Sequence, residues 1–301
     1  MGNDHHEFAF DGSQAIGSQQ LPDIEERSAF SGAADPGAAS PGRAISGAAD
    51  PGAAQAQLCL RRSQAYRFLV DALLYPQENW LEDLPLLRPA LDEIGLQGFS
   101  LPGFDLDLAT LQAGHRRAFG LTGSLCYETE YGLPNEYRQS QELADLAGFY
   151  RAFGFQVGGE RRERPDHLAV ELEFMHLLAL KEALAAARGD LQRVQICQEA
   201  QRSFLRDHLG RWVGWFSAAL QATAALQATD AATQAAAAQA ADGLPDSEDL
   251  NAPFAWVGRL VLELVQAEAR RLGISLDVRR PQQLRPTPPA PDLACQACPL
   301  G

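Results

Sequence analysis

Helical periodicity of the apolar residues restricts the fold of this chain more than any other feature. From Leu58 to Leu74, apolar side chains recur with spacings of three and four, at residues 58, 65, 66, 69, 70, 73 and 74, which places them on one face of a helix. Similar spacing recurs as far as Val278, whereas β-branched residues are sparse and strand-like alternation is absent. The sequence therefore predicts an all-α fold, a single helical bundle domain over residues 58–278.

Proline positions and apolar stripes divide this domain into segments. Pro76 ends the first helix, and Pro165 is well placed to begin a later one because the first-turn N–H has no helical acceptor. An alanine-rich stretch, Ala231–Ala241, is a helix continuation or a loop. We expect helices over residues 58–74, 80–94, 106–119, 141–153, 165–187, 191–226 and 253–272.

Both ends of the chain differ from this domain in composition. Residues 1–57 are rich in Ala, Gly and Ser, lack Trp and Tyr, and contain the string SGAADPGAA twice, at 31–39 and 46–54. Residues 279–301 contain six prolines and the pair Cys295 and Cys298 in a Cys-x-x-Cys pattern. Segments so poor in large apolar side chains cannot offset the entropy of ordering their backbone. We expect both tails to be disordered, with the two thiols exposed and without a fixed role.

The charge balance limits the possible partners. The chain has 25 basic and 39 acidic residues, a net charge of −14, and its single lysine is Lys181. Without a basic patch, nucleic acid is an unsuitable partner. No run reaches the length of about 18 apolar residues that a membrane span needs, and the first residues show no secretory signal. The five cysteines are too few for a disulfide scaffold. We expect a cytoplasmic protein without membrane insertion.

Candidate catalytic residues are few. Glu173 and His176 form a Glu-x-x-His pattern on one helical face, as in di-iron carboxylate bundles, but no second copy of the pattern exists in the chain. There is no glycine-rich phosphate loop and no nucleophile elbow. These patterns alone identify no catalytic site, and a metal-carboxylate oxidase that uses Glu173 and His176 is kept as an alternative.

Two segments between helices carry unusual concentrations of polar residues. The first, residues 126–134, places Tyr127, Glu128 and Tyr131 in one loop. The second, residues 160–167, reads ERRERPDH and leads into an apolar helix. Binding residues concentrate in such loops. The simpler interpretation of the second segment is helix capping, with Asp166 in the first turn complementing the helix dipole.

These segments resemble a known family. Glu163-Arg164-Pro165-Asp166-His167 with the following LAVELEFM is similar to the hinge motif of the TorD/DmsD/NarJ family of molybdoenzyme chaperones. Residues 127–132, YETEYG, and residues 142–154, ELADLAGFYRAFG, are similar to the branch that serves type II dimethyl-sulfoxide-reductase-like enzymes. The resemblance covers about residues 58–273. The family hinge often reads Glu-Pro-x-Asp-His, whereas here proline directly precedes Asp166.

The resemblance implies a chaperone that is not an enzyme and holds no cofactor of its own. It would bind the twin-arginine leader or the apo form of a molybdopterin-containing catalytic subunit until the cofactor of that subunit is inserted. It implies client binding by Asp166, His167 and Glu163, with Tyr127, Glu128 and Tyr131 of the first loop as further candidates. A domain with a net charge of −10 would attract leader arginines. An acidic helical adaptor with an unrelated partner is the remaining alternative.

Overall fold

The computed structural model describes residues 51–120, 126–131, 136–158, 163–239 and 252–276. It consists of helices and turns: in the order of the chain, α1 (Pro51–Leu73), the 3-10 helix η1 (Trp80–Asp83), α2 (Leu84–Glu93), α3 (Leu108–Phe119), η2 (Glu128–Tyr131), α4 (Glu136–Ala152), α5 (Leu168–Ala187), α6 (Leu191–Asp207), η3 (Leu209–Arg211), α7 (Val213–Gln239) and α8 (Ala252–Leu272). The described residues contain no strand, so the all-α prediction is confirmed. Among these helices, none has the length and apolarity to cross a membrane.

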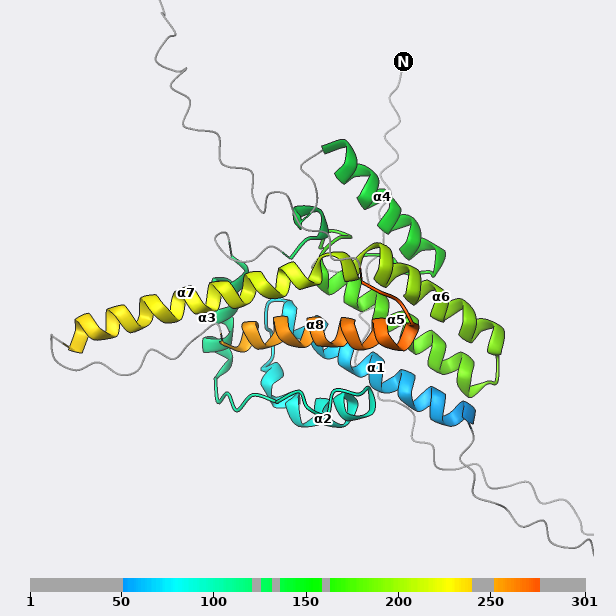
Figure 1. The fold of residues 1–301 in the computed structure, drawn as a ribbon, viewed down its shortest axis with the longest axis horizontal. Coiled ribbons are helices and arrows are strands. Elements are labelled where there is room, and N and C mark those ends of the chain that lie inside the picture. The colour runs from blue at the N-terminus through cyan, green and yellow to red at the C-terminus, as the bar shows by residue number, and fades with distance from the viewer. Residues whose placement is uncertain (1–50, 121–125, 132–135, 159–162, 240–251, 277–301) are drawn as a thin grey trace, which may run out of the picture. The chain divides into compact units, whose positions relative to one another are not determined.

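The pair formed by α1 and α5 is central to the domain. α5 is apolar nearly all round, and 13 of its 20 residues are buried, which is typical of a helix surrounded by others. The two helices run antiparallel, because Gln55 hydrogen-bonds to Glu182 near one end and Ser63 contacts His176 further along. α6 and α8 pack around this pair (Figure 1).

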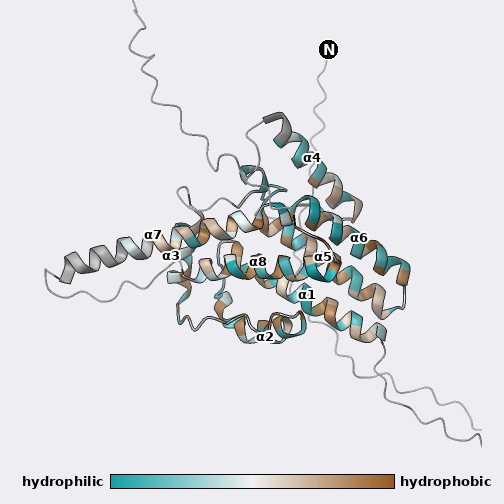
Figure 2. Cartoon of the chain, viewed as in Figure 1, coloured by the Kyte–Doolittle hydropathy of each residue, from teal (hydrophilic) through white to brown (hydrophobic). Residues whose placement is uncertain are grey.

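The remaining helices contribute amphipathic faces to one continuous core. Hydrophobic and hydrophilic residues alternate along most of them (Figure 2), and the buried faces meet in a cluster rich in aromatic rings. Phe174 of α5 lies at its centre: its ring is 4.9 Å from Phe204 of α6 and from Tyr150 of α4. Aromatic packing therefore holds α4 against the α5–α6 hairpin.

A network of buried charges joins four helices. The guanidinium of Arg62 on α1 is 1% exposed and donates to Glu182 of α5, Gln201 of α6 and Glu268 of α8. Its contacts with the two carboxylates measure 2.8 Å and 2.5 Å. Burial alone would raise the pKa of the Glu182 carboxyl, but the positive charges of Arg62 and Arg271 lower this pKa to about 2. The chain therefore buries two carboxylates with their charges compensated.

The starts of α1 and α5 differ from those that the sequence predicts. α1 begins at Pro51, seven residues before the expected start at Leu58, so residues 51–57 of the expected tail are helical. Pro51 suits a first helical position because it needs no hydrogen-bond acceptor. α5 begins at Leu168 rather than at Pro165, so Asp166 precedes the first turn. The disorder expected for residues 1–50 and 279–301 concerns positions outside the described residues.

The prediction of a single helix over residues 191–226 is also wrong. The structure divides it into α6 and α7, with His208 at φ −125°, ψ −94° and the short helix η3 between them. A Cβ on Gly210 would collide with the carbonyl oxygen of Leu205 and with the side chain of Leu276. The break therefore depends on a close backbone approach that only glycine permits. The helix expected over residues 80–94 is instead the 3-10 helix η1 followed by α2. The helix expected over residues 141–153 corresponds to α4, which is longer and begins at Glu136.

Replacing Arg62 by Leu should destabilise the domain by about 3–5 kcal/mol, because Glu182 and Glu268 would stay buried without a counter-charge. The matched control is Arg67→Leu, whose exposed ion pair with Asp71 should contribute less than about 1 kcal/mol. Urea unfolding of both variants measures the difference. Equal, small losses in the two variants would contradict the stabilising role of the network.

Candidate functional site

The described parts of the two polar segments, residues 126–131 and 163–167, lie side by side. Tyr127 and His167 form an isolated antiparallel bridge. The Glu128 N–H donates to the Asp166 carbonyl at 2.9 Å, and the Leu168 N–H donates to the Cys126 carbonyl at 2.7 Å. The backbone therefore fixes the first segment against the start of α5.

Asp166 locks these segments together from within. Its side chain is fully buried and accepts hydrogen bonds from Arg164 at 3.0 and 2.8 Å and from the Thr129 hydroxyl at 2.7 Å. The Thr129 N–H adds a further bond at 3.3 Å. The expected place of Asp166 in the first turn of the helix is wrong. The Asp166 carboxylate is directed towards Thr129 and Arg164 and not towards solvent, and these hydrogen bonds fix the loop.

His167 takes the capping role instead. Its Nδ1 accepts a hydrogen bond from the Ala169 N–H at 3.1 Å, which satisfies one of the free donors at the N-terminus of α5. The ring packs edge-on against Tyr127, with 5.1 Å between centroids. Burial lowers the pKa of His167, so the neutral imidazole, with its proton on Nε2, is the form that caps the helix.

Tyr127, Glu163 and Arg164 form the more exposed layer of the site. The Tyr127 hydroxyl donates to a Glu163 carboxylate oxygen at 3.4 Å, and the Arg164 guanidinium lies over the Tyr127 ring at 4.6 Å. Burial and the neighbouring Glu163 raise the pKa of the Tyr127 hydroxyl, which therefore stays protonated. Glu163 is partly exposed and makes only this long hydrogen bond among the described contacts, so its carboxylate is available to a partner.

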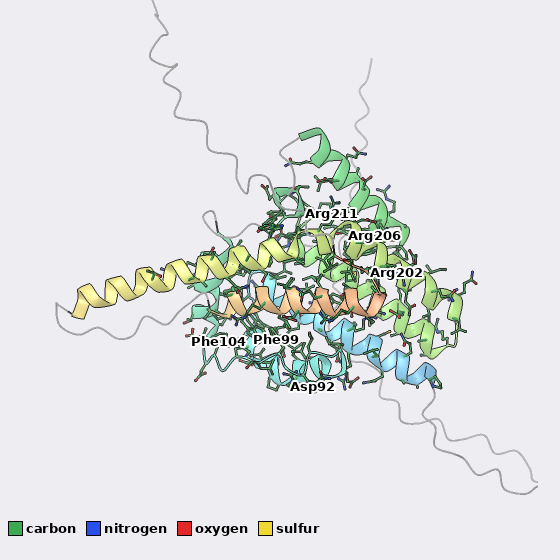
Figure 3. All side chains as sticks on the ribbon, in the orientation of Figure 1. Asp92, Phe99, Phe104, Arg202, Arg206 and Arg211 are labelled. Carbon is green, nitrogen blue, oxygen red and sulfur yellow. The ribbon has the colours of Figure 1, made fainter. Side chains whose placement is uncertain are left out.

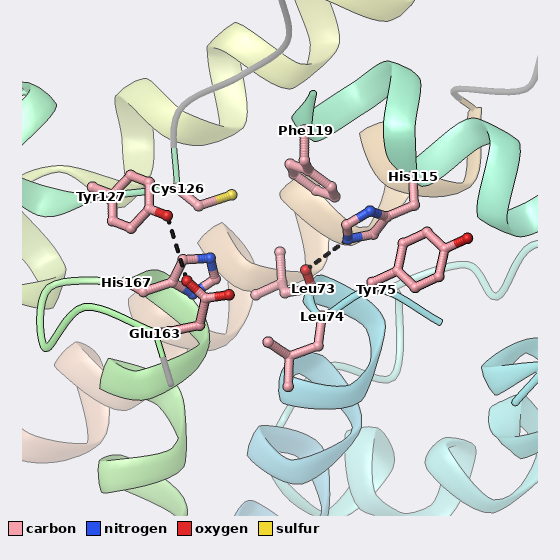
Figure 4. Close-up of a pocket in the computed structure, with 9 residues that line it drawn as sticks. All are labelled: Leu73, Leu74, Tyr75, His115, Phe119, Cys126, Tyr127, Glu163 and His167. Carbon is pink, nitrogen blue, oxygen red and sulfur yellow. Dashed lines mark hydrogen bonds between the residues drawn. The ribbon is translucent and has the colours of Figure 1, made fainter. Parts of the chain in front are cut away.

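A cavity of about 200 Å³ opens beside these residues (Figure 4). Helices α1 and α3 supply its other walls, and the His115 Nε2–H donates to the Leu73 carbonyl at 3.0 Å. The nine lining residues are Leu73, Leu74, Tyr75, His115, Phe119, Cys126, Tyr127, Glu163 and His167. Burial lowers the pKa of His115 and His167, so Glu163 carries the formal charge among these residues at neutral pH. Such a cavity suits a cationic or hydrogen-bonding group flanked by apolar atoms.

Glu128 and Tyr131 point away from this cavity. Glu128 is 8% exposed, with an oxygen 3.2 Å from Nδ1 of His208. The Tyr131 ring packs against Trp212 at 5.3 Å. Of the six predicted binding residues, the structure brings Tyr127, Glu163 and His167 to the cavity, places Asp166 beneath them, and uses Glu128 and Tyr131 to anchor the loop towards η3.

Several residues of this site were not predicted. They are far from the polar loops in the sequence: Leu73 ends α1, Tyr75 follows it, and His115 and Phe119 lie on α3. In the sequence, each resembles an ordinary residue of an amphipathic helix. The Cys126 thiol is also part of the wall, and burial raises its pKa, which disfavours the reactive thiolate. Arg164 belongs to the charge cluster that the sequence revealed, but its contact with Asp166 depends on the turn before α5.

His176, which the alternative metal-site hypothesis uses as a ligand, contacts helix α1. The Nδ1 of His176 lies 2.9 Å from both the hydroxyl and the carbonyl oxygen of Ser63, so α1 engages this ring. Within the described ranges, no group of three or more His, Cys, Asp or Glu side chains is placed to hold a metal ion. Cys295 and Cys298 lie outside those ranges.

Residues 104–218 match the family model described as the nitrate reductase delta subunit. Over this segment, the chain is similar to that family. The matched segment contains α3, both polar loops and the α5–α6 hairpin. The resemblance to the NarJ/TorD-type family is thereby confirmed, although the match is narrower than the expected range of 58–273.

Three curated relatives match parts of the chain. It is 34% identical over 116 residues to a selenate reductase assembly chaperone protein of Thauera selenatis, and equally to a chlorate reductase assembly chaperone protein of Ideonella dechloratans; each alignment covers 38% of this chain and 59% of the relative. A perchlorate reductase assembly chaperone protein of Dechloromonas aromatica is 39% identical over 85 residues, 28% of this chain and 37% of the relative. The chain thus matches less than two thirds of these relatives' lengths. No solved structure matches it.

Asp166→Asn should lower the free energy of unfolding by roughly 1–3 kcal/mol, because an amide cannot accept all the bonds that Arg164 and Thr129 donate. Asp145→Asn on the exposed face of α4 is the control and should change stability by less than about 0.5 kcal/mol. Chemical denaturation measures both. An unchanged stability in Asp166→Asn would show that the loop does not depend on this carboxylate.

The protein should lose stability as the pH falls below about 6.5, because the lowered pKa of His167 means that the unfolded chain takes up the proton first. His167→Asn keeps a capping oxygen but does not titrate, so its stability should depend less on pH between about 6.5 and 5. His115 and His176 titrate in both proteins and cancel in the comparison. Thermal melts across this range measure the effect; parallel curves would contradict it.

Proposed function

We propose that this protein is a cytoplasmic assembly chaperone that binds the catalytic subunit of a molybdopterin-containing oxidoreductase before export. The main observation is that residues 104–218, which match the nitrate reductase delta subunit model, contain the cavity's polar residues Tyr127, Glu163 and His167. Parts of the chain are also similar to three reductase assembly chaperones. The cavity presents a carboxylate and hydrogen-bonding groups without an activated nucleophile. This arrangement supports binding rather than catalysis.

The proposed client segment is the twin-arginine leader or an exposed part of the apo subunit. A leader joins arginines to an apolar stretch. The carboxylate of Glu163 offers a guanidinium a charge-assisted hydrogen bond, and the aromatic rings of Tyr75 and Phe119 offer apolar contact in the same cavity. The net charge of −14 would favour the approach of a cationic segment.

The predicted client-binding residues then divide into two groups. Glu163, Tyr127 and the Nε2 edge of His167 contact the client. Asp166 positions them by fixing the loop, and Glu128 and Tyr131 hold the same loop against His208 and Trp212. Loss of Glu163 should reduce affinity alone, whereas loss of Asp166, Glu128 or Tyr131 should reduce stability as well. Loss of His167 should also reduce both, because this residue caps α5.

Glu163→Gln should weaken binding of the client's leader peptide by about tenfold, since a charge-assisted hydrogen bond contributes roughly 1.5 kcal/mol or more. The melting temperature should stay within about 1 °C of wild type, because Glu163 makes a single long internal bond. The control Glu263→Gln, on α8 outside the cavity, removes the same charge and should leave affinity unchanged. Calorimetric titration with the peptide measures all three proteins.

The chaperone function itself is tested in cells. Deleting the gene should lower the cofactor content and activity of the client oxidoreductase while its transcript level stays constant, and the apo subunit should copurify with the tagged protein. Normal cofactor content in the deletion strain would overturn the proposed function. Unchanged peptide affinity in Glu163→Gln would instead move the binding site away from this cavity and leave the function standing.

A further inference from the structure

A second hollow lies where the end of α5 meets the start of α6. Its volume is about 350 Å³, and none of its lining residues belongs to the cavity beside His167. Phe153, which follows α4, closes one side. The other lining residues are Lys181, Leu184, Ala185, Arg188, Asp190, Arg193, Ile196 and Cys197. We call it the hairpin groove.

Large apolar side chains are exposed at this groove. Leu184 is 56% exposed and Ile196 is 50% exposed, and Leu191 in the adjoining first turn of α6 is 73% exposed. They make up half of the large apolar side chains exposed in the described part of the chain, the others being Leu60, Tyr75 and Leu86. Such clustering of apolar surface is characteristic of an interaction site.

The groove is also basic, in contrast to the acidic chain around it. Lys181, Arg188 and Arg193 line it against one acid, Asp190. Arg193 pairs with Asp190 at 3.3 Å, whereas Lys181 and Arg188 form no ion pair among the contacts described for this chain. Their charges are therefore available to an incoming partner.

Other cations of the same hairpin are already compensated. Further along α6, Arg202 pairs with Glu199 and Arg206 pairs with Asp207. Figure 3 labels these two arginines. These pairs leave little unbalanced charge on that part of the helix. Uncompensated positive charge beside exposed leucine and isoleucine is therefore localised at the groove.

We propose that the hairpin groove binds an acidic segment of a partner protein that inserts apolar side chains between Leu184 and Ile196 while its carboxylates pair with Lys181 and Arg188. The shape favours a peptide segment, since the concave space accepts a few side chains and is closed on one side by Phe153. An anionic membrane is a poorer fit, because a flat surface presents no side chains that could enter the concave space. The preferred charge is opposite to that of the cavity at Glu163, so the two sites select different segments.

The test uses the full chain and a fluorescein-labelled helical peptide of Glu-Leu-Leu-Glu repeats, with fluorescence anisotropy as the readout. The double variant Lys181→Glu with Arg188→Glu should weaken binding at least about tenfold, and Leu184→Ser should weaken it several-fold. All three positions are exposed, so the variants should still fold, which circular dichroism verifies. Arg259→Glu, exposed on α8 outside the groove, is the matched control and should bind as wild type does.

Equal affinity in the groove variants and wild type would overturn the proposal. So would equally tight binding of the matching Lys-Leu-Leu-Lys peptide, since apolar contact alone would then explain the affinity. Stronger binding to vesicles containing phosphatidylglycerol would assign the groove to a membrane surface instead. Dimerisation that is lost on Leu184→Ser, measured by sedimentation, would assign it to a second copy of this chain. Glu163→Gln should leave the acidic peptide's affinity unchanged, which separates this result from the proposed function.

Discussion

The buried guanidinium of Arg62 is the interaction on which the arrangement of the domain depends. It joins α1 to α5, α6 and α8 through Glu182, Gln201 and Glu268, and Arg271 adds a second cation at the edge of the network. Apolar packing supplies most of the stability but tolerates small shifts of one helix along another. A network of directed, charged hydrogen bonds does not, because every displaced carboxylate would be left buried and unpaired.

This constraint reaches the candidate site through the register of α1 and α5. The two helices run antiparallel with Arg62 opposite Glu182 and Ser63 opposite His176. The C-terminus of α1, which provides Leu73 and Tyr75, therefore lies beside the N-terminus of α5, where His167 forms the cap. α3 completes the cavity, since His115 bonds to the last turn of α1. The cavity is thus assembled at one end of the central pair, and the hairpin groove lies at the other end of α5.

The two sites differ in how their charge arises. At the cavity, the positive charge of Arg164 is paired with the buried carboxylate of Asp166, whereas Glu163 makes only a long hydrogen bond with Tyr127 among the described contacts. At the groove, the charges of Lys181 and Arg188 are not compensated by the neighbouring carboxylate of Glu182, because Glu182 pairs with Arg62 in the interior. The same buried network therefore fixes the helices and keeps the carboxylate of Glu182 in the interior, which leaves Asp190 as the acid that lines the groove. A protein with these two faces can hold a cationic segment and an acidic segment at separate places.

Sequence patterns alone determined the helical class and the approximate extent of α3 and α8, because an amphipathic stripe reports which face of a helix is buried. They also identified the two loops that meet at Tyr127 and His167, since concentrated polar residues between apolar helices stand out locally. Only the tertiary structure decided the rest. Asp166 is buried because Arg164 and Thr129 enclose it, the helix after Asp207 breaks because Gly210 lies against Leu205 and Leu276, and α1 and α3 wall the cavity. Each of these outcomes depends on atoms that are distant in the chain or on a backbone turn, and local periodicity carries no information about either.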